Sequence, residues 1–71
     1  MTKYFMHKGM MYRATLWIAS KTMGFSVAPW PDFEWSDVGV LQTKPIFHKE
    51  FPIQKNQSQD IDYYIEHWKK L

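Results

Sequence analysis

The last fourteen residues, SQDIDYYIEHWKKL, carry the pattern that most restricts how this chain can fold. Apolar residues recur there at spacings of three and four, which is the pattern of one side of an α-helix. The residues on that side are Ile61, Tyr64, Ile65, Trp68 and Leu71. A helix of about twelve residues is not stable alone in water, so it needs an apolar surface to pack on. Ser58 or Asp60 is suited to cap its start. We therefore expect a C-terminal helix within residues 58–71 that lies against a sheet.

Two segments before this helix have the composition and alternation of strands. In MMYRATLWIA one side carries Tyr12, Ala14, Leu16 and Ile18, and the other carries Arg13, Thr15 and Trp17. The turn-forming segment SKTMG follows, and residues 25–28 resume an extended pattern, so the sequence predicts a β-hairpin over residues 10–28. Residues 1–9 are expected to form either an edge strand, with residues 3–7 pairing back across the turn, or a flexible arm.

The prolines at positions 29 and 31 end the second strand of this hairpin, and we expect a loop up to residue 37. One or two short strands are predicted within residues 38–48. The expected fold class is α+β, a three- or four-stranded antiparallel sheet with one C-terminal helix packed on one face. With 71 residues, the chain is too short for two folded units, so residues 1–71 are expected to form a single small domain.

The composition indicates a folded cytoplasmic protein. Hydrophobic residues make up 45% and aromatic residues 18% of the chain, which is too apolar for a disordered protein. There is no cysteine, so disulfides cannot stabilise the fold as they do in many small domains. We expect burial of the aromatic side chains to stabilise it instead. Neither a signal peptide nor a membrane span is recognised, and a chain without cysteine is compatible with a reducing cytosol. We expect no membrane association.

No pattern of residues indicates catalysis or metal binding. The histidines, His7, His48 and His67, are far apart and have no cysteine near them, so no metal-ligand spacing exists. The three glycines are isolated, which excludes a glycine-rich phosphate loop, and no nucleophile stands beside a base in a familiar motif. The sequence therefore predicts a protein that is not an enzyme and that has no cofactor.

The segment from Trp30 to Asp37 is the main candidate for binding a partner. It combines three aromatic with three acidic residues: Trp30, Asp32, Phe33, Glu34, Trp35 and Asp37. Aromatic side chains serve as interface anchors, and neighbouring carboxylates can meet arginine or lysine of a partner. The alternative is that these rings fold under the sheet as a satellite core.

A second candidate surface lies on the side of the first hairpin strand that carries Trp17 and Arg13. Residues 1–31 contain no acidic residue. Trp17 could stack on the bases of a single-stranded nucleic acid, and Arg13 with Lys3, Lys8 and Lys21 could neutralise its phosphates. The acidic segment after residue 31 would repel phosphate. Trp17 could instead be buried under the N-terminal segment or across a dimer interface.

The leading hypothesis is a non-catalytic inhibitor or adaptor that blocks a larger protein or nucleoprotein complex by steric occlusion. Small, cysteine-free, aromatic-rich α+β chains are common among phage and mobile-element accessory proteins, and by this analogy of type the target would be a CRISPR effector or restriction complex. The alternatives are a small domain that binds single-stranded nucleic acid and a homodimeric structural subunit that pairs through the Trp17 side. The chain is thus expected to be a monomer or a homodimer.

Overall fold

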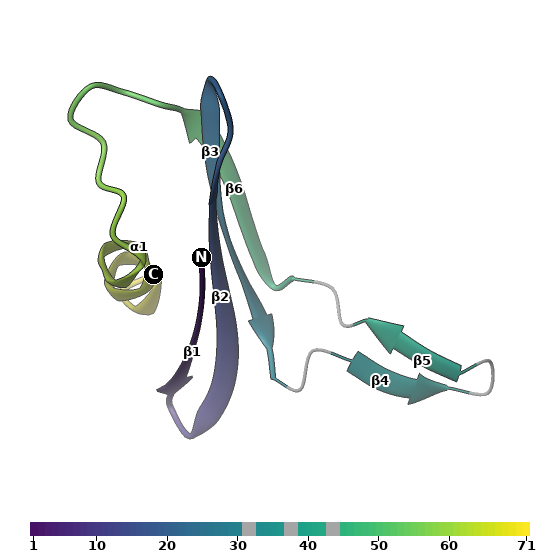
Figure 1. The fold of residues 1–71 in the computed structure, drawn as a ribbon. Helices are drawn as coiled ribbons and strands as arrows, with labels where there is room; N and C mark the ends of the chain where they lie inside the picture. The colour runs from purple at the N-terminus through teal and green to yellow at the C-terminus, as the bar shows by residue number, and fades with distance from the viewer. Residues whose placement is uncertain (31–32, 37–38, 43–44) are drawn as a thin grey trace.

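The computed structural model of the chain is a four-stranded antiparallel sheet with one helix on one face, and a separate two-stranded sheet (Figure 1). The structure describes residues 1–30, 33–36, 39–42 and 45–71, and side chains only for residues 1–30 and 45–71. The elements are β1 (Thr2–His7), β2 (Met10–Ile18), β3 (Thr22–Pro29), β4 (Phe33–Ser36), β5 (Gly39–Gln42), β6 (Phe47–Pro52) and α1 (Ile61–Lys69). The α+β class and the single C-terminal helix predicted from the sequence are confirmed.

The four-stranded sheet has the strand order β1-β2-β3-β6, and each strand is antiparallel to its neighbours. The predicted hairpin of residues 10–28 corresponds to β2 and β3. Residues 2–7 form the edge strand β1, so the flexible-arm alternative for this segment is wrong. Lys8 and Gly9 connect β1 to β2 with φ angles of 51° and 79°. Two consecutive positive φ angles are those of a two-residue hairpin turn whose twist matches that of the strands, and glycine adopts such an angle without steric cost.

Helix α1 begins and ends inside the predicted range of residues 58–71. Asp60 is its N-cap, and the Asp60 carboxylate accepts a hydrogen bond of 3.1 Å from the backbone N–H of Asp62. Leu71, which the spacing assigned to the apolar stripe, lies beyond the helix end and is 86% exposed. Within the part of the chain that the structure describes, no helix is long and apolar enough to cross a membrane.

The core lies on one side of the four-stranded sheet, between the sheet and α1. Its buried residues come from β2, β3 and α1: Ala14, Leu16, Met23, Phe25, Val27, Ile61 and Ile65. Alternation along β2 and β3 directs every second side chain to this face. The ring of Tyr64 stacks on Phe25, with a centroid separation of 5.6 Å, and joins the helix to β3. Among the described residues, no polar or charged side chain is buried.

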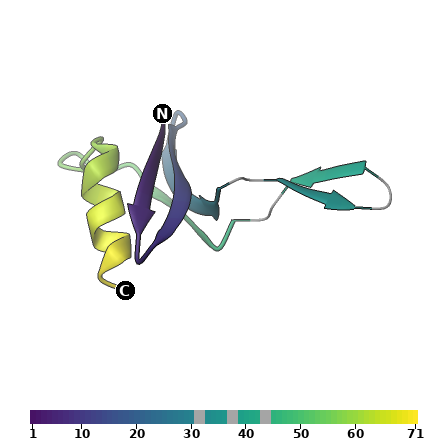
Figure 2. The same ribbon diagram turned by 90° about the horizontal axis from the view of Figure 1, so that it is seen from below.

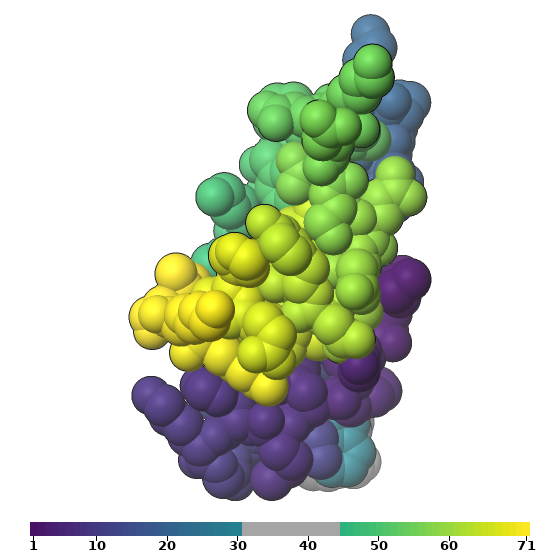
Figure 3. All heavy atoms as spheres, turned by 90° about the vertical axis from the view of Figure 1, so that its left-hand side faces the viewer, coloured from purple at the N-terminus to yellow at the C-terminus, as the bar shows by residue number. Residues whose placement is uncertain are grey.

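Helix α1 is not centred over the sheet. It packs most closely on β2 and β1, at one side of the four-stranded sheet (Figure 2). A space-filling view of this face shows α1 lying above the β1–β2 turn, with the segment that follows β6 running along one side of it (Figure 3). The β6 side is therefore covered less completely.

Residues 33–36, predicted to be part of a loop, form the strand β4 and pair with β5 in the two-stranded sheet. The alternation of aromatic and polar residues in FEWS has the period of a strand, but the preceding prolines at positions 29 and 31 favoured a loop. Strand β6 also continues to Pro52, beyond the predicted limit of residue 48. Pro52 is compatible with β6 because this strand is at the edge of the sheet and proline there removes no ladder donor.

We expect Ile65→Ala to lower the stability of the domain by about 2 to 4 kcal/mol, because it removes a buried side chain that holds α1 on the sheet. The measurement is urea unfolding followed by circular dichroism. Glu66→Ala, a change at an exposed neighbour on the same helix, is the matched control and should stay within about 0.5 kcal/mol of the wild type. Equal effects of the two changes would contradict the packing of α1 described here.

Candidate functional site

The face of the four-stranded sheet opposite α1, here called the open face, is not covered by any described helix or strand (Figure 1). The strand register assigns the following residues to it: Thr2, Tyr4, Met6, Met11, Arg13, Thr15, Trp17, Gly24, Ser26, Ala28, His48 and Glu50. A sheet that packs only one face on a core normally carries polar residues on the other. Here that second face also carries large apolar side chains, which is the feature that requires an explanation.

Apolar side chains gather on the open face where β1, β2 and the end of β3 meet. This aromatic patch consists of Tyr4, Met6, Met11 and Trp30. Tyr4, Met6 and Trp30 are each at least half exposed, and Met11 is partly buried. The rings of Tyr4 and Trp30 meet edge to face, with centroids 6.3 Å apart. Tyr4, Met11 and Trp30 line a shallow cavity of about 370 Å³. The arrangement is suited to receive an apolar side chain of another molecule.

Trp17 lies across the open face and is partly buried by the sheet itself. It faces Gly24 on β3, where an added Cβ atom would be 2.0 Å from the indole ring. The far side of the ring approaches His48 on β6, with ring centroids 5.3 Å apart. Strand β1 lies beside β2 in the same sheet, so the N-terminal segment does not cover Trp17 as one alternative expected.

The basic residues proposed for nucleic-acid binding do not converge on one surface. Arg13 and Trp17 are both on the open face, with Thr15 between them. Lys3 is on the α1 side and forms an ion pair with Asp62. Lys8 and Lys21 lie in the turns at opposite ends of β2. The structure therefore separates the cations that a phosphate backbone would have to contact together.

The residues proposed to bind a partner are in two parts of the structure. Trp30 belongs to the aromatic patch and is 50% exposed, so its ring is not part of a satellite core. The backbone of Phe33, Glu34 and Trp35 forms β4. Asp32 and Asp37 lie outside the described residues. The aromatic patch therefore extends this candidate site to Tyr4, Met6 and Met11. The sequence did not single these residues out, because the pairing of β1 with β2 is needed to bring them close to Trp30.

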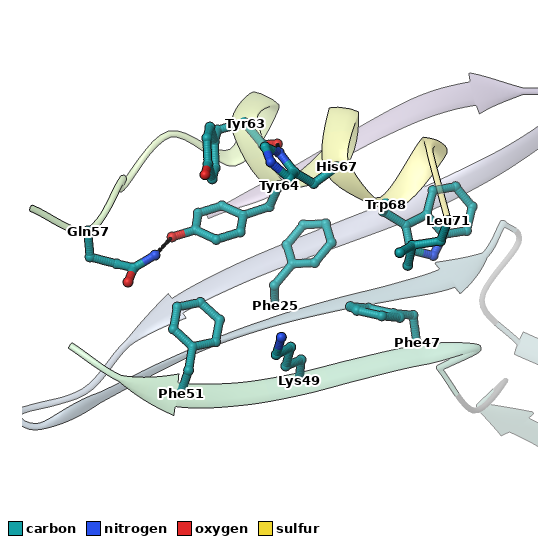
Figure 4. Close-up of a pocket in the computed structure, with 10 residues that line it drawn as sticks. All are labelled: Phe25, Phe47, Lys49, Phe51, Gln57, Tyr63, Tyr64, His67, Trp68 and Leu71. Carbon is teal, nitrogen blue, oxygen red and sulfur yellow. Dashed lines mark hydrogen bonds between the residues drawn. The ribbon is translucent and has the colours of Figure 1, made fainter. Parts of the chain in front are cut away.

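A second surface lies on the α1 side and was not expected from the sequence. A groove of about 430 Å³ runs between α1 and β6, and Figure 4 shows the residues that line it. Its walls are mainly aromatic, with Phe25, Phe47, Phe51, Tyr64 and Trp68, and Lys49 supplies an amine. The sequence signal for this groove is the segment FHKEF, in which a lysine stands midway between two phenylalanines. In a strand, these three side chains point to the same face.

These surfaces offer apolar contact, hydrogen bonding and charge. Among the described residues there is no group of three or more His, Asp or Glu side chains that could hold a metal ion. His48 and Glu50 form an exposed pair with a separation of 3.5 Å between Nε2 and Oε1 on the open face.

Comparison of the chain with protein-family models, with curated proteins and with solved structures finds no match.

Packing of Trp17 on Gly24 predicts that Gly24→Ala displaces the indole ring and costs about 2 kcal/mol of stability. In a Trp17→Ala background the same change should be neutral or stabilising, because alanine is preferred to glycine within a strand. A double-mutant cycle by urea unfolding measures this coupling. Additive effects of the two changes would be incompatible with the contact.

Proposed function

We propose that this chain is a non-catalytic protein-binding module, an inhibitor or adaptor, which contacts its partner through the open face and the β4–β5 hairpin. The observation that carries this proposal is the aromatic patch of Tyr4, Met6, Met11 and Trp30 on an uncovered sheet face. Such side chains supply a large apolar contact area, and aromatic residues and methionine are enriched in protein interfaces.

The β4–β5 hairpin supports the same proposal. It forms a sheet of only two strands, separate from the main sheet, and an isolated pair of strands is marginally stable in water. In two perpendicular views the hairpin extends away from the sheet on the side opposite α1 (Figures 1 and 2). A partner that lies on the open face would therefore be within reach of the hairpin, and its surface would stabilise the strand pair.

The total surface of the protein is also large for its mass. The accessible area is 5417 Å², whereas about 4,700 Å² is typical for a folded chain of this size. The excess is similar to the roughly 800 Å² that one partner contributes to a standard protein interface. Burial of such an area would bring the exposed surface closer to that of an ordinary small domain.

In its finer form, the proposal is steric occlusion of a nucleic-acid-handling complex, such as a CRISPR effector or restriction complex. The acidic residues Asp32, Glu34 and Asp37 would imitate phosphate toward a basic surface of the target. This target class rests on the sequence and on the analogy with small accessory proteins of phages and mobile elements.

We expect the double substitution Tyr4→Ala and Trp30→Ala to weaken partner binding by about 30-fold or more, since removing two interface anchors costs at least about 2 kcal/mol. The partner is first captured with the tagged wild-type protein from nuclease-treated lysate, identified by mass spectrometry, and purified. Calorimetry then gives its affinity for each variant. Tyr63→Ala is the matched control, because Tyr63 is an exposed aromatic residue on α1, and it should change the affinity less than about twofold.

Three results would contradict the proposal. A partner that binds the double variant as tightly as the wild type would exclude the open face as the contact surface. Loss of every partner after nuclease treatment would favour single-stranded nucleic acid as the ligand. Self-association of the wild type in light scattering, abolished by the double substitution, would favour the homodimeric subunit. Circular dichroism of each variant establishes that the domain is still folded.

A further inference from the structure

The groove between α1 and β6 follows from the position of the helix. Because α1 packs closest to β2 and β1, the side chains of β6 that point to the same face have no helix directly above them. Phe51 stacks on Tyr64, with ring centroids 5.7 Å apart, and Phe47 meets Phe25 edge to face at 6.1 Å. Phe25 is buried and belongs to the core, whereas the rings of Phe47, Phe51 and Tyr64 are only partly buried and form the walls of the groove (Figure 4).

Lys49 is the unusual residue of this groove. It occupies the position between Phe47 and Phe51 on the α1 side of β6, and the strand register puts it directly opposite Phe25. The alternation of β6 would place an apolar residue there. Figure 4 shows the Lys49 side chain rising from β6 into the space between the aromatic rings.

The ammonium group of Lys49 has no ion-pair or hydrogen-bond partner among the described residues. The nearby acidic residues are used elsewhere. Asp62 pairs with Lys3, Glu66 lies 3.3 Å from the ammonium nitrogen of Lys69, and Glu50 is on the open face beside His48. None of the side chains that line the groove is acidic. The groove therefore combines apolar walls with one uncompensated positive charge.

Three other polar groups at the groove, the Tyr64 hydroxyl, the Gln57 amide nitrogen and His67 Nδ1, are already engaged within the protein. The Tyr64 hydroxyl donates to the backbone carbonyl of Ser58 and accepts a hydrogen bond from the Gln57 side chain. His67 Nδ1 lies 2.9 Å from the carbonyl oxygen of Tyr63. The volume of about 430 Å³ is within the range of small-molecule sites, about 300 to 1,000 Å³.

From these observations we propose that the groove binds a small amphipathic carboxylate, with its apolar part against Phe25, Phe51 and Tyr64 and its carboxylate at Lys49. A charged hydrogen bond from the lysine would fix the orientation of the ligand, and the rings would supply most of the contact. The site is on the opposite face of the sheet from the aromatic patch, so it does not depend on the proposed partner binding.

The test compares 2-naphthoate with 2-naphthol, which have the same ring system but differ in charge at pH 7. Titrations of the isotope-labelled protein are followed by the amide shifts of β6 and α1 in NMR spectra. We expect the carboxylate to bind roughly fivefold to tenfold more tightly than the alcohol, an advantage limited by the solvent exposure of Lys49. In Lys49→Met this ratio should fall to about one, because methionine keeps an apolar side chain of similar length and removes the charge.

Lys55→Met is the matched control, since Lys55 is an exposed lysine outside the groove, and it should keep the ratio of the wild type. Decanoate in place of 2-naphthoate distinguishes an alkyl from an aryl carboxylate as the preferred ligand. The proposal is overturned if neither carboxylate shifts the amides of β6 and α1, or if the ratio is the same in the wild type and in Lys49→Met. Lys49→Ala provides a second variant if the methionine variant does not fold.

Discussion

The packing of one short helix on a four-stranded sheet is the constraint on which the rest of the structure depends. A helix is about 10 Å wide and neighbouring strands are about 4.8 Å apart, so one helix covers about two strands. Helix α1 covers β1 and β2 best, and its buried residues Ile61 and Ile65 complete the core there. The groove beside β6 and the whole open face are the parts of the sheet that remain. Both candidate surfaces thus arise from the same shortage of helical cover.

The open face shows how the sheet compensates in part for this shortage. Trp17 lies flat on its own sheet because Gly24 leaves space for the ring, and the indole covers backbone that would otherwise face water. No comparable arrangement protects Tyr4, Met6 and Trp30, which stay at least half exposed. Tyr4 and Trp30 contact each other edge to face, but this contact leaves about half of each side chain in water. Recognition of another molecule, as proposed above, would account for their exposure.

Much of the fold could be predicted because the local patterns are strong. The alternation along β2 and the spacing of the apolar residues on α1 each identify an element and its buried side. Residues 33–36 were assigned to a loop because two prolines precede them, and an alternation that extends over only four residues is a weak strand signal. The aromatic patch could not be predicted, because Tyr4, Met11 and Trp30 are distant in the sequence and meet only through the register of β1, β2 and β3. The same holds for the groove, which depends on where α1 lies across the sheet.

The two surfaces share strand β6, whose residues alternate between them. Lys49 points to the groove, while His48 and Glu50 belong to the open face. A ligand in the groove would bind only the folded domain and would stabilise it by about 1.4 kcal/mol at ten times its dissociation constant. It would change the affinity of a partner on the open face only if binding at the two sites is energetically coupled. Such a coupling would act equally in both directions. Because the buried layer of Phe25 and Val27 separates the surfaces and need not move for either event, the expected coupling is small. The groove ligand would therefore act mainly on the amount of folded protein that is available to the partner.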